Sequence, residues 1–435
     1  MTAIYLNPIF YAATNHKYDC LDYFSVDPHF GGDEALADLT KALHDNNMQL
    51  ILDVSINHTG TAHKWFNKEA TFFDKSVGAY NNKDAKERSY YFFNDDNSYK
   101  AWFDVPTLPT LNYTSKELKE ELFNGENSLV KKWLKAPYNT DGWRFDVADV
   151  MAKNDKIQLD KEVWPLINKA IKGTNPHAYI LSEDWDDCIE HLQGDQWDSA
   201  MNYYGCGRPV REFAGDIDLF NSRNYILKNH PYKMTASDLA GRINNYLTRI
   251  PDTIKDVTFN LFDSHDTPRL HNNPKITEGA YEGAVKLLFT LPGAVNIYYG
   301  DEIGIDGTID SNEGCRYPMD WEKASKKDCK EYRLYSTLAK LKKESPALNR
   351  GAYSIPYAEG YIFSMLRFLN NEVYLLVWSR EKEDKEITIP LDIIDSFSIK
   401  ADALTDILGD KIEASINNRE LTITIPSDKA FLIKL

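Results

Sequence analysis

The chain has 435 residues, of which 43% are hydrophobic and 27% charged, a composition that excludes a disordered or fibrous protein. Asp and Glu number 66 against 50 Lys and Arg, so the net charge of −16 argues against nucleic acid and anionic membranes as partners. The length predicts roughly three domains.

Targeting and redox signals are weak in this sequence. No Lys or Arg precedes the apolar first ten residues, so we expect no signal peptide and a cytoplasmic protein. The apolar run over 287–299 is too short to span a bilayer and contains Pro292, which predicts buried core rather than a membrane helix. Five cysteines without paired spacing predict reduced thiols, with neither a disulfide framework nor a zinc site.

Short β-branched or aromatic runs alternate with helical patterns, as in βα units that build a parallel sheet. Seven runs predict parallel strands: 2–6, 49–54, 142–146, 178–182, 197–201, 258–262 and 294–298. Helical spacing predicts a helix over 33–46, and Thr114 and Glu117 have the spacing of a capping box. That second helix is expected to contain Leu118, Leu122, Leu129 and Trp133.

Two other regions depart from the alternating pattern. Residues from about Thr59 to Asn112 are polar and aromatic without long periodicity, which predicts an excursion out of the sheet. From about Tyr353 the pattern changes to hairpins, with strands expected at 361–368, 372–378, 385–390 and 421–426 and a turn at Asn370 and Asn371. A separate antiparallel β domain is therefore expected to close the chain.

Four predicted strands end in polar residues, at the carboxyl edge where parallel α/β folds place their sites. The segments are 53–58 (Asp-Val-Ser-Ile-Asn-His), 142–146 (Gly-Trp-Arg-Phe-Asp), 181–185 (Leu-Ser-Glu-Asp-Trp) and 262–266 (Phe-Asp-Ser-His-Asp). Arg144 and Asp146 share one face of their strand, and a cation there favours the ionised carboxylate. Glu183 precedes Trp185, a setting in which desolvation raises the pKa of a carboxyl. One ionised and one protonated carboxyl group are the minimum set for glycoside cleavage.

Each of these residues also has a structural interpretation. A single strand-end Asp or Glu is more often a cap or a solvated loop residue, and Arg144 with Asp146 could be a structural ion pair. His58 and His265 could be core histidines, and Trp185 could be ordinary packing. The joint occurrence of four such strand ends in one order favours the catalytic interpretation.

In this order the segments resemble the conserved regions of the α-amylase superfamily of retaining glycoside hydrolases, in its neopullulanase, cyclomaltodextrinase and maltogenic-amylase branch. Residues 53–58 resemble the first region, 142–146 the nucleophile region, Glu183 the acid/base region and His265-Asp266 the last. Residues 108–112 (Leu-Pro-Thr-Leu-Asn) resemble the branch motif M-P-K-L-N with two changes, and 15–19, 27–31 and 299–302 also match. The similarity covers nearly the whole chain.

The resemblance implies an α/β fold, a (β/α)8 TIM barrel with an inserted small domain and a C-terminal antiparallel β-sandwich. The expected boundaries are 1–58 and 113–350 for the barrel, 59–112 for the inserted domain and 351–435 for the sandwich. Residues 4–7 match the second barrel strand of the family, so the first βα unit is expected to be missing and the sheet to have open edges. The N-terminal domain common in this branch would lie further upstream.

Carried over residue by residue, the resemblance implies that Asp146 is the nucleophile, Glu183 the general acid/base and Asp266 the third catalytic carboxylate. Arg144 keeps Asp146 charged, and His58 and His265 bind sugar hydroxyls. Tyr18 and Trp185 stack against sugar rings, with Trp185 on the leaving-group side. Ser182 and Ser264 stand where many relatives have Gly and Asn.

The implied substrates are α-1,4-linked maltodextrins, cyclodextrins, starch or pullulan, and the chain could form a homodimer. No cofactor is required, although Asn57 lies where many relatives bind calcium. Three alternatives stay open: a 4-α-glucanotransferase, a non-catalytic glucan-binding protein and an inactive truncated chain. Retention of Asp146, Glu183 and Asp266 disfavours the second alternative.

Overall fold

The computed structural model describes residues 1–217, 229, 233–391 and 404–435. The chain divides into two compact units. The first contains Met1–Asp184 and Glu190–Ala200, and the second contains Trp185–Ile189 and Met201–Leu435.

A five-stranded parallel sheet forms the centre of the first unit. Its strands, in spatial order, are β1 (Ala3–Tyr5), β4 (Gln49–Ser55), β5 (Gly142–Asp146), β8 (Tyr179–Ser182) and β9 (Ser199–Ala200). All pairs are parallel, and the register sets Asp53 beside Arg144 and Ser55 beside Asp146. These strands confirm the first five of the seven predicted runs, and their shared direction brings the polar carboxyl ends to one edge.

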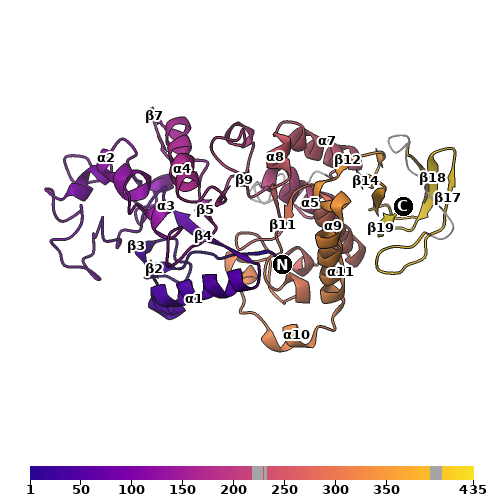
Figure 1. The fold of residues 1–435 in the computed structure, drawn as a ribbon, viewed down its shortest axis with the longest axis horizontal. Coiled ribbons are helices and arrows are strands. Elements are labelled where there is room, and N and C mark those ends of the chain that lie inside the picture. Colours follow the sequence, from indigo (N-terminus) through magenta and orange to yellow (C-terminus); the bar gives the residue numbers. More distant parts are fainter. Residues whose placement is uncertain (218–228, 230–232, 392–403) are drawn as a thin grey trace. The chain divides into compact units, whose positions relative to one another are not determined.

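Helices cover this sheet, as Figure 1 shows for α1 (Gly32–Asp45), α3 (Leu129–Lys132) and α4 (Asp160–Thr174) around β4 and β5. Helix α4 buries one apolar stripe with helical spacing: Val163, Trp164, Ile167 and Ile171. The unit also has the hairpins β2 (Phe10–Ala12) with β3 (Cys20–Val26), and β6 (Lys153–Asn154) with β7 (Ile157–Gln158). Short 3-10 turns lie at Pro28–Phe30, Lys86–Tyr90 and Trp102–Asp104.

The helix predicted from Thr114 differs from the prediction in two ways. Ser115, not Thr114, is the N-cap, because the Thr114 amide and hydroxyl both donate to Asn112. The helical segment is also interrupted: α2 (Lys116–Lys119) runs into a π-turn (Glu120–Asn124), and α3 begins only at Leu129. Gly125 ends the first part, and a Cβ at this position would lie only 2.6 Å from the carbonyl oxygen of Glu120.

The two ends of the 59–112 segment are tied together. Backbone amides of Thr59 and Thr61 donate to the carbonyls of Pro109 and Thr107, and the Leu111 amide donates to the Asn57 carbonyl. This antiparallel ladder fixes the residues that follow β4 against the Leu-Pro-Thr-Leu-Asn segment. The boundaries of an inserted domain stay a prediction.

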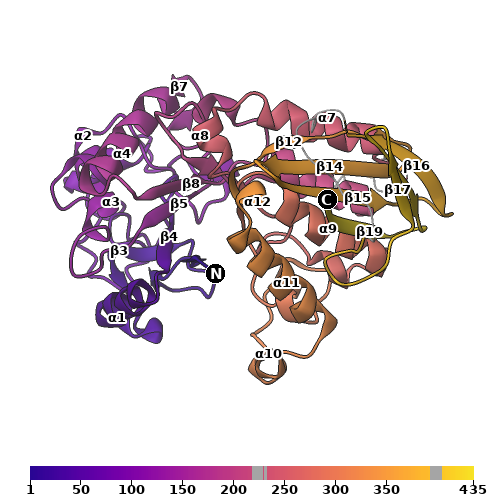
Figure 2. The same ribbon diagram turned by 45° about the vertical axis from the view of Figure 1, so that its right-hand side comes forward.

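The second unit contains the parallel pair β10 (Phe259–Asn260) and β11 (Ala294–Val295), which confirms the last two predicted runs, and Met201 pairs in parallel with Phe259. Among the described residues of this unit, the helices are α5 (Arg208–Ala214), α7 (Ala236–Leu247), α8 (Asp252–Lys255), α9 (Glu278–Thr290), α10 (Trp321–Lys326), α11 (Lys330–Glu344) and α12 (Pro346–Arg350). Helix α9 is buried along most of its length, against α11 and the strands β15 (Glu372–Ser379) and β19 (Ala430–Lys434) (Figure 2).

The C-terminal part is antiparallel, as the hairpin pattern predicts. One sheet contains β12 (Ala352–Ser354), β13 (Ala358–Glu359), β14 (Ile362–Leu369), β15 (Glu372–Ser379) and β19 (Ala430–Lys434). The other contains β16 (Lys385–Pro390), β18 (Glu420–Ile425) and β17 (Ala414–Asn417). Apolar side chains of both sheets share one core, although part of the predicted domain, 392–403, lies outside the described residues. The sandwich and its boundaries stay predictions.

Two further sequence expectations concern the whole chain. All five cysteines are free thiols, and four of them are buried. Among the described helices, none has both the length and the apolar character that crossing a membrane requires.

Gly283 of α9 provides a test of this packing, because a Cβ there would lie 2.1 Å from Nε1 of Trp378 on β15. We expect Gly283→Ala to lower the free energy of unfolding by about 1–3 kcal/mol, although alanine favours the helix. Gly241 of α7 has no atom within 4 Å of the added Cβ, so Gly241→Ala should raise stability by about 0.5–1 kcal/mol. Urea denaturation of both variants measures the two changes, and equal effects would contradict the packing argument.

Candidate active site

One buried guanidinium organises the carboxyl edge of the first unit. Nη1 of Arg144 lies 3.0 Å from both carboxylate oxygens of Asp53 and 2.9 Å from Oδ1 of Asp146. Its Nη2 lies 2.9 Å from Oε2 of Glu183. Arg144 is fully buried, so the strands β4, β5 and β8 each place a carboxylate on one cation. The predicted nucleophile and acid/base therefore lie side by side.

Two tyrosines complete the hydrogen bonds of Asp53. The hydroxyls of Tyr5 and Tyr18 donate to Oδ2 of Asp53 over 2.7 and 2.9 Å. The Arg144 guanidinium also lies over the ring of Tyr18, 5.8 Å from its centroid. Asp53 is thus a structural carboxylate that orients Arg144 and Tyr18. Asp146 and Glu183 each contact a different nitrogen of the same guanidinium.

Burial raises the pKa of the Asp146 carboxyl well above its usual range. Arg144 opposes this shift, while the nearby carboxylates of Glu183 and Asp53 and a hydrogen bond with Glu183 add to it. Arg144 lowers the pKa of Asp146, as predicted. Because three carboxylates share this one cation, its effect on the pKa is smaller than the effect of burial. Two close carboxyls in a buried setting disfavour each other's ionisation.

Backbone and carboxylate groups surround Glu183. The amide of Val147 donates to Oε2 of Glu183 over 3.0 Å, and Val147 has φ of 52°, an uncommon conformation for a β-branched residue. Burial and the carboxylates of Asp184 and Glu183 raise the pKa of Asp149 to about 7. Glu183, the predicted general acid, thus lies near a carboxyl whose pKa is raised, that of Asp149.

His58 also lies in the first unit and is buried. Its ring stacks on Trp102 of the 59–112 segment, with centroids 4.9 Å apart and planes 14° apart. Its Nδ1 lies 3.2 Å from Nδ2 of Asn57, and burial lowers its pKa to about 4. A neutral imidazole held by an aromatic ring can donate or accept a hydrogen bond to a sugar hydroxyl.

The second unit contains the His265-Asp266 pair. Nε2 of His265 lies 3.1 Å from Oδ2 of Asp266, and His265 is buried while Asp266 is 31% exposed. Arg316 reaches both residues: Nε donates to the His265 carbonyl over 2.8 Å, and Nη2 donates to Oδ1 of Asp266 over 3.4 Å. Arg316 therefore orients Asp266.

Trp185 lies in the second unit as well. Its ring stacks on Tyr203, with centroids 3.7 Å apart and planes 5° apart. The Tyr203 hydroxyl donates to the side-chain oxygen of Ser264 over 3.0 Å, and Ser264 in turn accepts the Asp266 amide. Trp185 is thus connected through Tyr203 to the segment of the third carboxylate.

Among the described residues, two clusters of acidic and histidine side chains could hold a metal ion. They are Asp160, Glu190 and His191, and Asp263, His271 and Asp301. Lys153 and Lys161 pair with acids of the first cluster, and Arg211 and Arg269 with acids of the second. Because these cations already balance the carboxylates, neither cluster resembles the all-oxygen cage of calcium. Calcium binding stays a prediction.

The structure brings Tyr18, His58, Arg144, Asp146 and Glu183 into the first unit and Trp185, His265 and Asp266 into the second. Tyr5, Trp102, Tyr203 and Arg316 were not predicted. Tyr5 ends β1 and lies next to the last residue of the predicted strand 2–6, so its position could have revealed it, as for Asp53. The other three lie outside the strand ends, and only their tertiary contacts reveal them.

Comparison with known proteins gives a consistent result. The family described as "Alpha amylase, catalytic domain" matches residues 1–333. A cyclomaltodextrinase of Geobacillus thermopakistaniensis is 33% identical over 400 residues, which cover 90% of this chain and 61% of that protein. An intracellular maltogenic amylase of Bacillus subtilis is 32% identical over 351 residues, covering 81% and 54%. The chain therefore spans about three fifths or less of the length of these relatives.

Among solved structures, the debranching enzyme of Nostoc punctiforme is similar over 100% of this chain and 86% of its own, with a TM-score of 0.80 and 28% identity. A cyclomaltodextrinase structure has a TM-score of 0.77 and 26% identity over 99% of this chain and 68% of its own.

The low pKa of His58 predicts a pH dependence of stability. The folded chain keeps this imidazole neutral down to about pH 4, whereas the unfolded chain protonates it near 6.5. The neutral His58 imidazole therefore contributes fully to the free energy of unfolding above pH 6.5, and this contribution is lost as the pH falls towards 4. We expect the free energy of unfolding to fall between pH 7 and 5 by about 2 kcal/mol less in His58→Gln than in the unmutated chain. Exposed His177→Gln is the control, and parallel pH profiles for all three chains would refute the assignment.

Proposed function

Since the chain belongs to the alpha-amylase family, we propose that it is a retaining α-glucan hydrolase. The catalytic domain of this family is a (β/α)8 barrel, and the five-stranded parallel sheet of the first unit agrees with it. The proposed substrates are the α-1,4-glucosidic bonds of maltodextrins, cyclodextrins, starch or pullulan. The names of the cyclomaltodextrinase and the maltogenic amylase support this substrate class.

The observation that carries the proposal is the position of Asp146 and Glu183 on one guanidinium. Their oxygens each lie 2.9 Å from a nitrogen of Arg144, so the two carboxyls are close neighbours. Retaining enzymes need carboxyls only ~5–5.5 Å apart, because one of them attacks the sugar directly. An inverting pair lies further apart, with room for a water molecule between carboxylate and sugar.

In the proposed mechanism, the ionised carboxylate of Asp146 attacks the anomeric carbon and forms a covalent glycosyl-enzyme. Glu183 donates its proton to the leaving glycosidic oxygen, then takes a proton from the water that attacks the intermediate. Each bond that forms is matched by one that breaks, and Glu183 is protonated again at the end. Arg144 stabilises the returning charge of Asp146.

The remaining residues are proposed to bind the sugar. Asp266, oriented by Arg316, accepts hydrogen bonds from sugar hydroxyls and favours the distorted, oxocarbenium-like ring. His58 and His265 bind hydroxyls at the cleavage point, Tyr18 stacks against that sugar, and Trp185 lies on the leaving-group side. A cytoplasmic homodimer, with or without calcium, belongs to the same proposal, and the name of the intracellular relative supports the location.

Asp146→Asn tests the nucleophile, because it removes the attacking charge with little change of shape. We expect loss of turnover on β-cyclodextrin and pullulan by at least about a thousandfold, with an unchanged circular dichroism spectrum. Asp155→Asn, at an exposed ion pair with Lys100, is the matched control and should retain full activity. Chromatography of the products would show linear maltodextrins or panose for a hydrolase, and chains longer than the substrate for a glucanotransferase. Near-normal activity of Asp146→Asn would contradict the assignment.

Glu183→Gln tests the general acid. A poor leaving group needs a proton from Glu183 to depart, whereas a good one such as fluoride does not. The variant should lose about 10²–10⁴-fold in kcat/KM on maltodextrins and much less on a maltosyl fluoride. Equal losses on both substrates would argue against the role of Glu183 as acid.

A further inference from the structure

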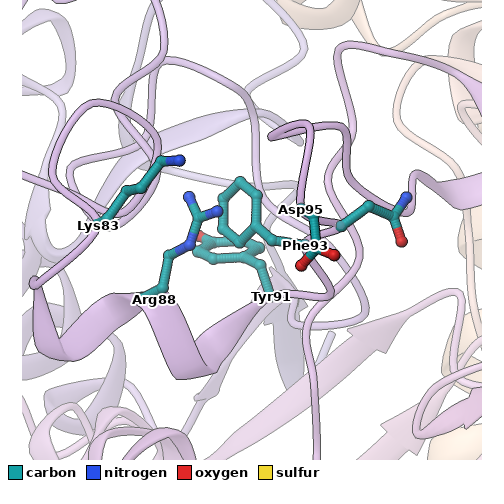
Figure 3. A pocket seen from close by; sticks show the side chains of 6 residues that line it. Lys83, Arg88, Tyr91, Phe93 and Asp95 are labelled. Carbon is teal, nitrogen blue, oxygen red and sulfur yellow. The ribbon is translucent and has the colours of Figure 1, made fainter.

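A polar pocket lies in the 59–112 segment, apart from the catalytic carboxylates. It has a volume of about 350 Å³ and is lined by Lys83, Arg88, Tyr91, Phe93, Asn94 and Asp95 (Figure 3). All of these residues come from one short stretch of the first unit, around the 3-10 turn Lys86–Tyr90. The volume is near the lower end of the range for small-molecule sites, roughly 300–1,000 Å³.

Arg88 is held in a fixed position at this pocket. Its guanidinium carbon lies 3.3 Å from the centroid of the Phe93 ring, and its Nη1 donates to the Ala79 carbonyl over 3.0 Å. Phe66 also stacks parallel to Phe93, with centroids 5.6 Å apart and planes 6° apart. The guanidinium of Arg88 therefore covers one face of Phe93, and this planar donor group lines the pocket.

The two cations of the pocket have no carboxylate partner. No acid among the described residues lies within 4.0 Å of Arg88 or Lys83, although the neighbouring Lys64, Lys86 and Lys100 are all paired. Asp95 lines the same pocket without pairing with either cation. Partial burial lowers the pKa of Arg88, and no nearby anion offsets this effect.

From these contacts we infer that the pocket binds the phosphate monoester of a sugar. The guanidinium of Arg88 has the planar fork that suits phosphate oxygens, and Lys83 adds a second positive charge. Asn94 and Asp95 provide the acceptors that sugar hydroxyls require. The phosphate could belong to a free hexose phosphate or to a phosphorylated glucan, which present the same group. The inference goes beyond the proposed catalytic function and does not depend on it.

The first test is calorimetric titration of the full chain, at low ionic strength, with glucose 6-phosphate, glucose and inorganic phosphate. We expect binding of glucose 6-phosphate, weaker binding of inorganic phosphate and none of glucose at this pocket. Absence of binding by glucose 6-phosphate would overturn the inference. So would equal affinity for glucose, which indicates a neutral sugar site, or equal affinity for inorganic phosphate, which indicates an unspecific anion site.

Variants assign the binding to this pocket. Lys83→Gln should weaken glucose 6-phosphate binding by about two- to fivefold, since Lys83 is an exposed cation, and Arg88→Gln by about tenfold or more. Because Arg88 also bonds Ala79, Lys83→Gln is the variant expected to keep its full melting temperature. Lys86→Gln, on the same turn but paired with Glu121, is the control and should bind normally. Unchanged affinity in both Lys83→Gln and Arg88→Gln would place the ligand elsewhere and refute the inference.

A second arm identifies the source of the phosphate. Retention on a phosphorylated maltodextrin, but not on the same dextrin after phosphatase treatment, would assign a glucan ester. Binding of glucose 6-phosphate without preference between the two dextrins would assign the free sugar phosphate. Turnover of unphosphorylated β-cyclodextrin by Lys83→Gln should equal that of the unmutated chain. The binding measurements do not depend on turnover, so a failure of the proposed hydrolase activity would leave this test valid.

Discussion

The interaction on which the site depends is the shared guanidinium of Arg144. A fully buried cation is costly unless its charge is balanced, and here Asp53, Asp146 and Glu183 all contribute. In return, the cation fixes three carboxylates from three different strands. Removal of Arg144 would leave three buried carboxyls to repel one another, so protonation rather than ionisation would become their lowest-energy state.

The strand order of the parallel sheet satisfies this constraint. Parallel pairing sets Asp53 beside Arg144 and Ser55 beside Asp146, so the carboxyl ends of β4, β5 and β8 meet at one edge. Alternation along β5 then aims Arg144 and Asp146 to the same face. The closeness of Asp146 and Glu183 is thus a consequence of sheet geometry, whereas the pKa of Asp146 is raised by burial and by the neighbouring carboxylates of Glu183 and Asp53.

Much of this arrangement could be predicted from the sequence, because apolar strands that end in acids are local signals. The seven strands and the grouping of Arg144, Asp146 and Glu183 are of this kind. Ser115 as the helix cap was missed because Asn112 competes for Thr114, a choice that local spacing does not decide. Trp102 and Arg316 could not be found from spacing, since a loop contact between residues far apart in sequence leaves no periodic pattern.

The ladder that joins Thr59 and Thr61 to Pro109 and Thr107 isolates the strand end at His58 from changes of length in the segment between Thr61 and Thr107. Once the ends of a loop are fixed to each other, doubling its length costs only about 0.6 kcal/mol of closure entropy. Insertions and deletions between Thr61 and Thr107 can therefore accumulate without displacing His58 from the strand end. Relatives of this chain are expected to differ most in length there, and the pocket at Arg88 lies within that freely varying part.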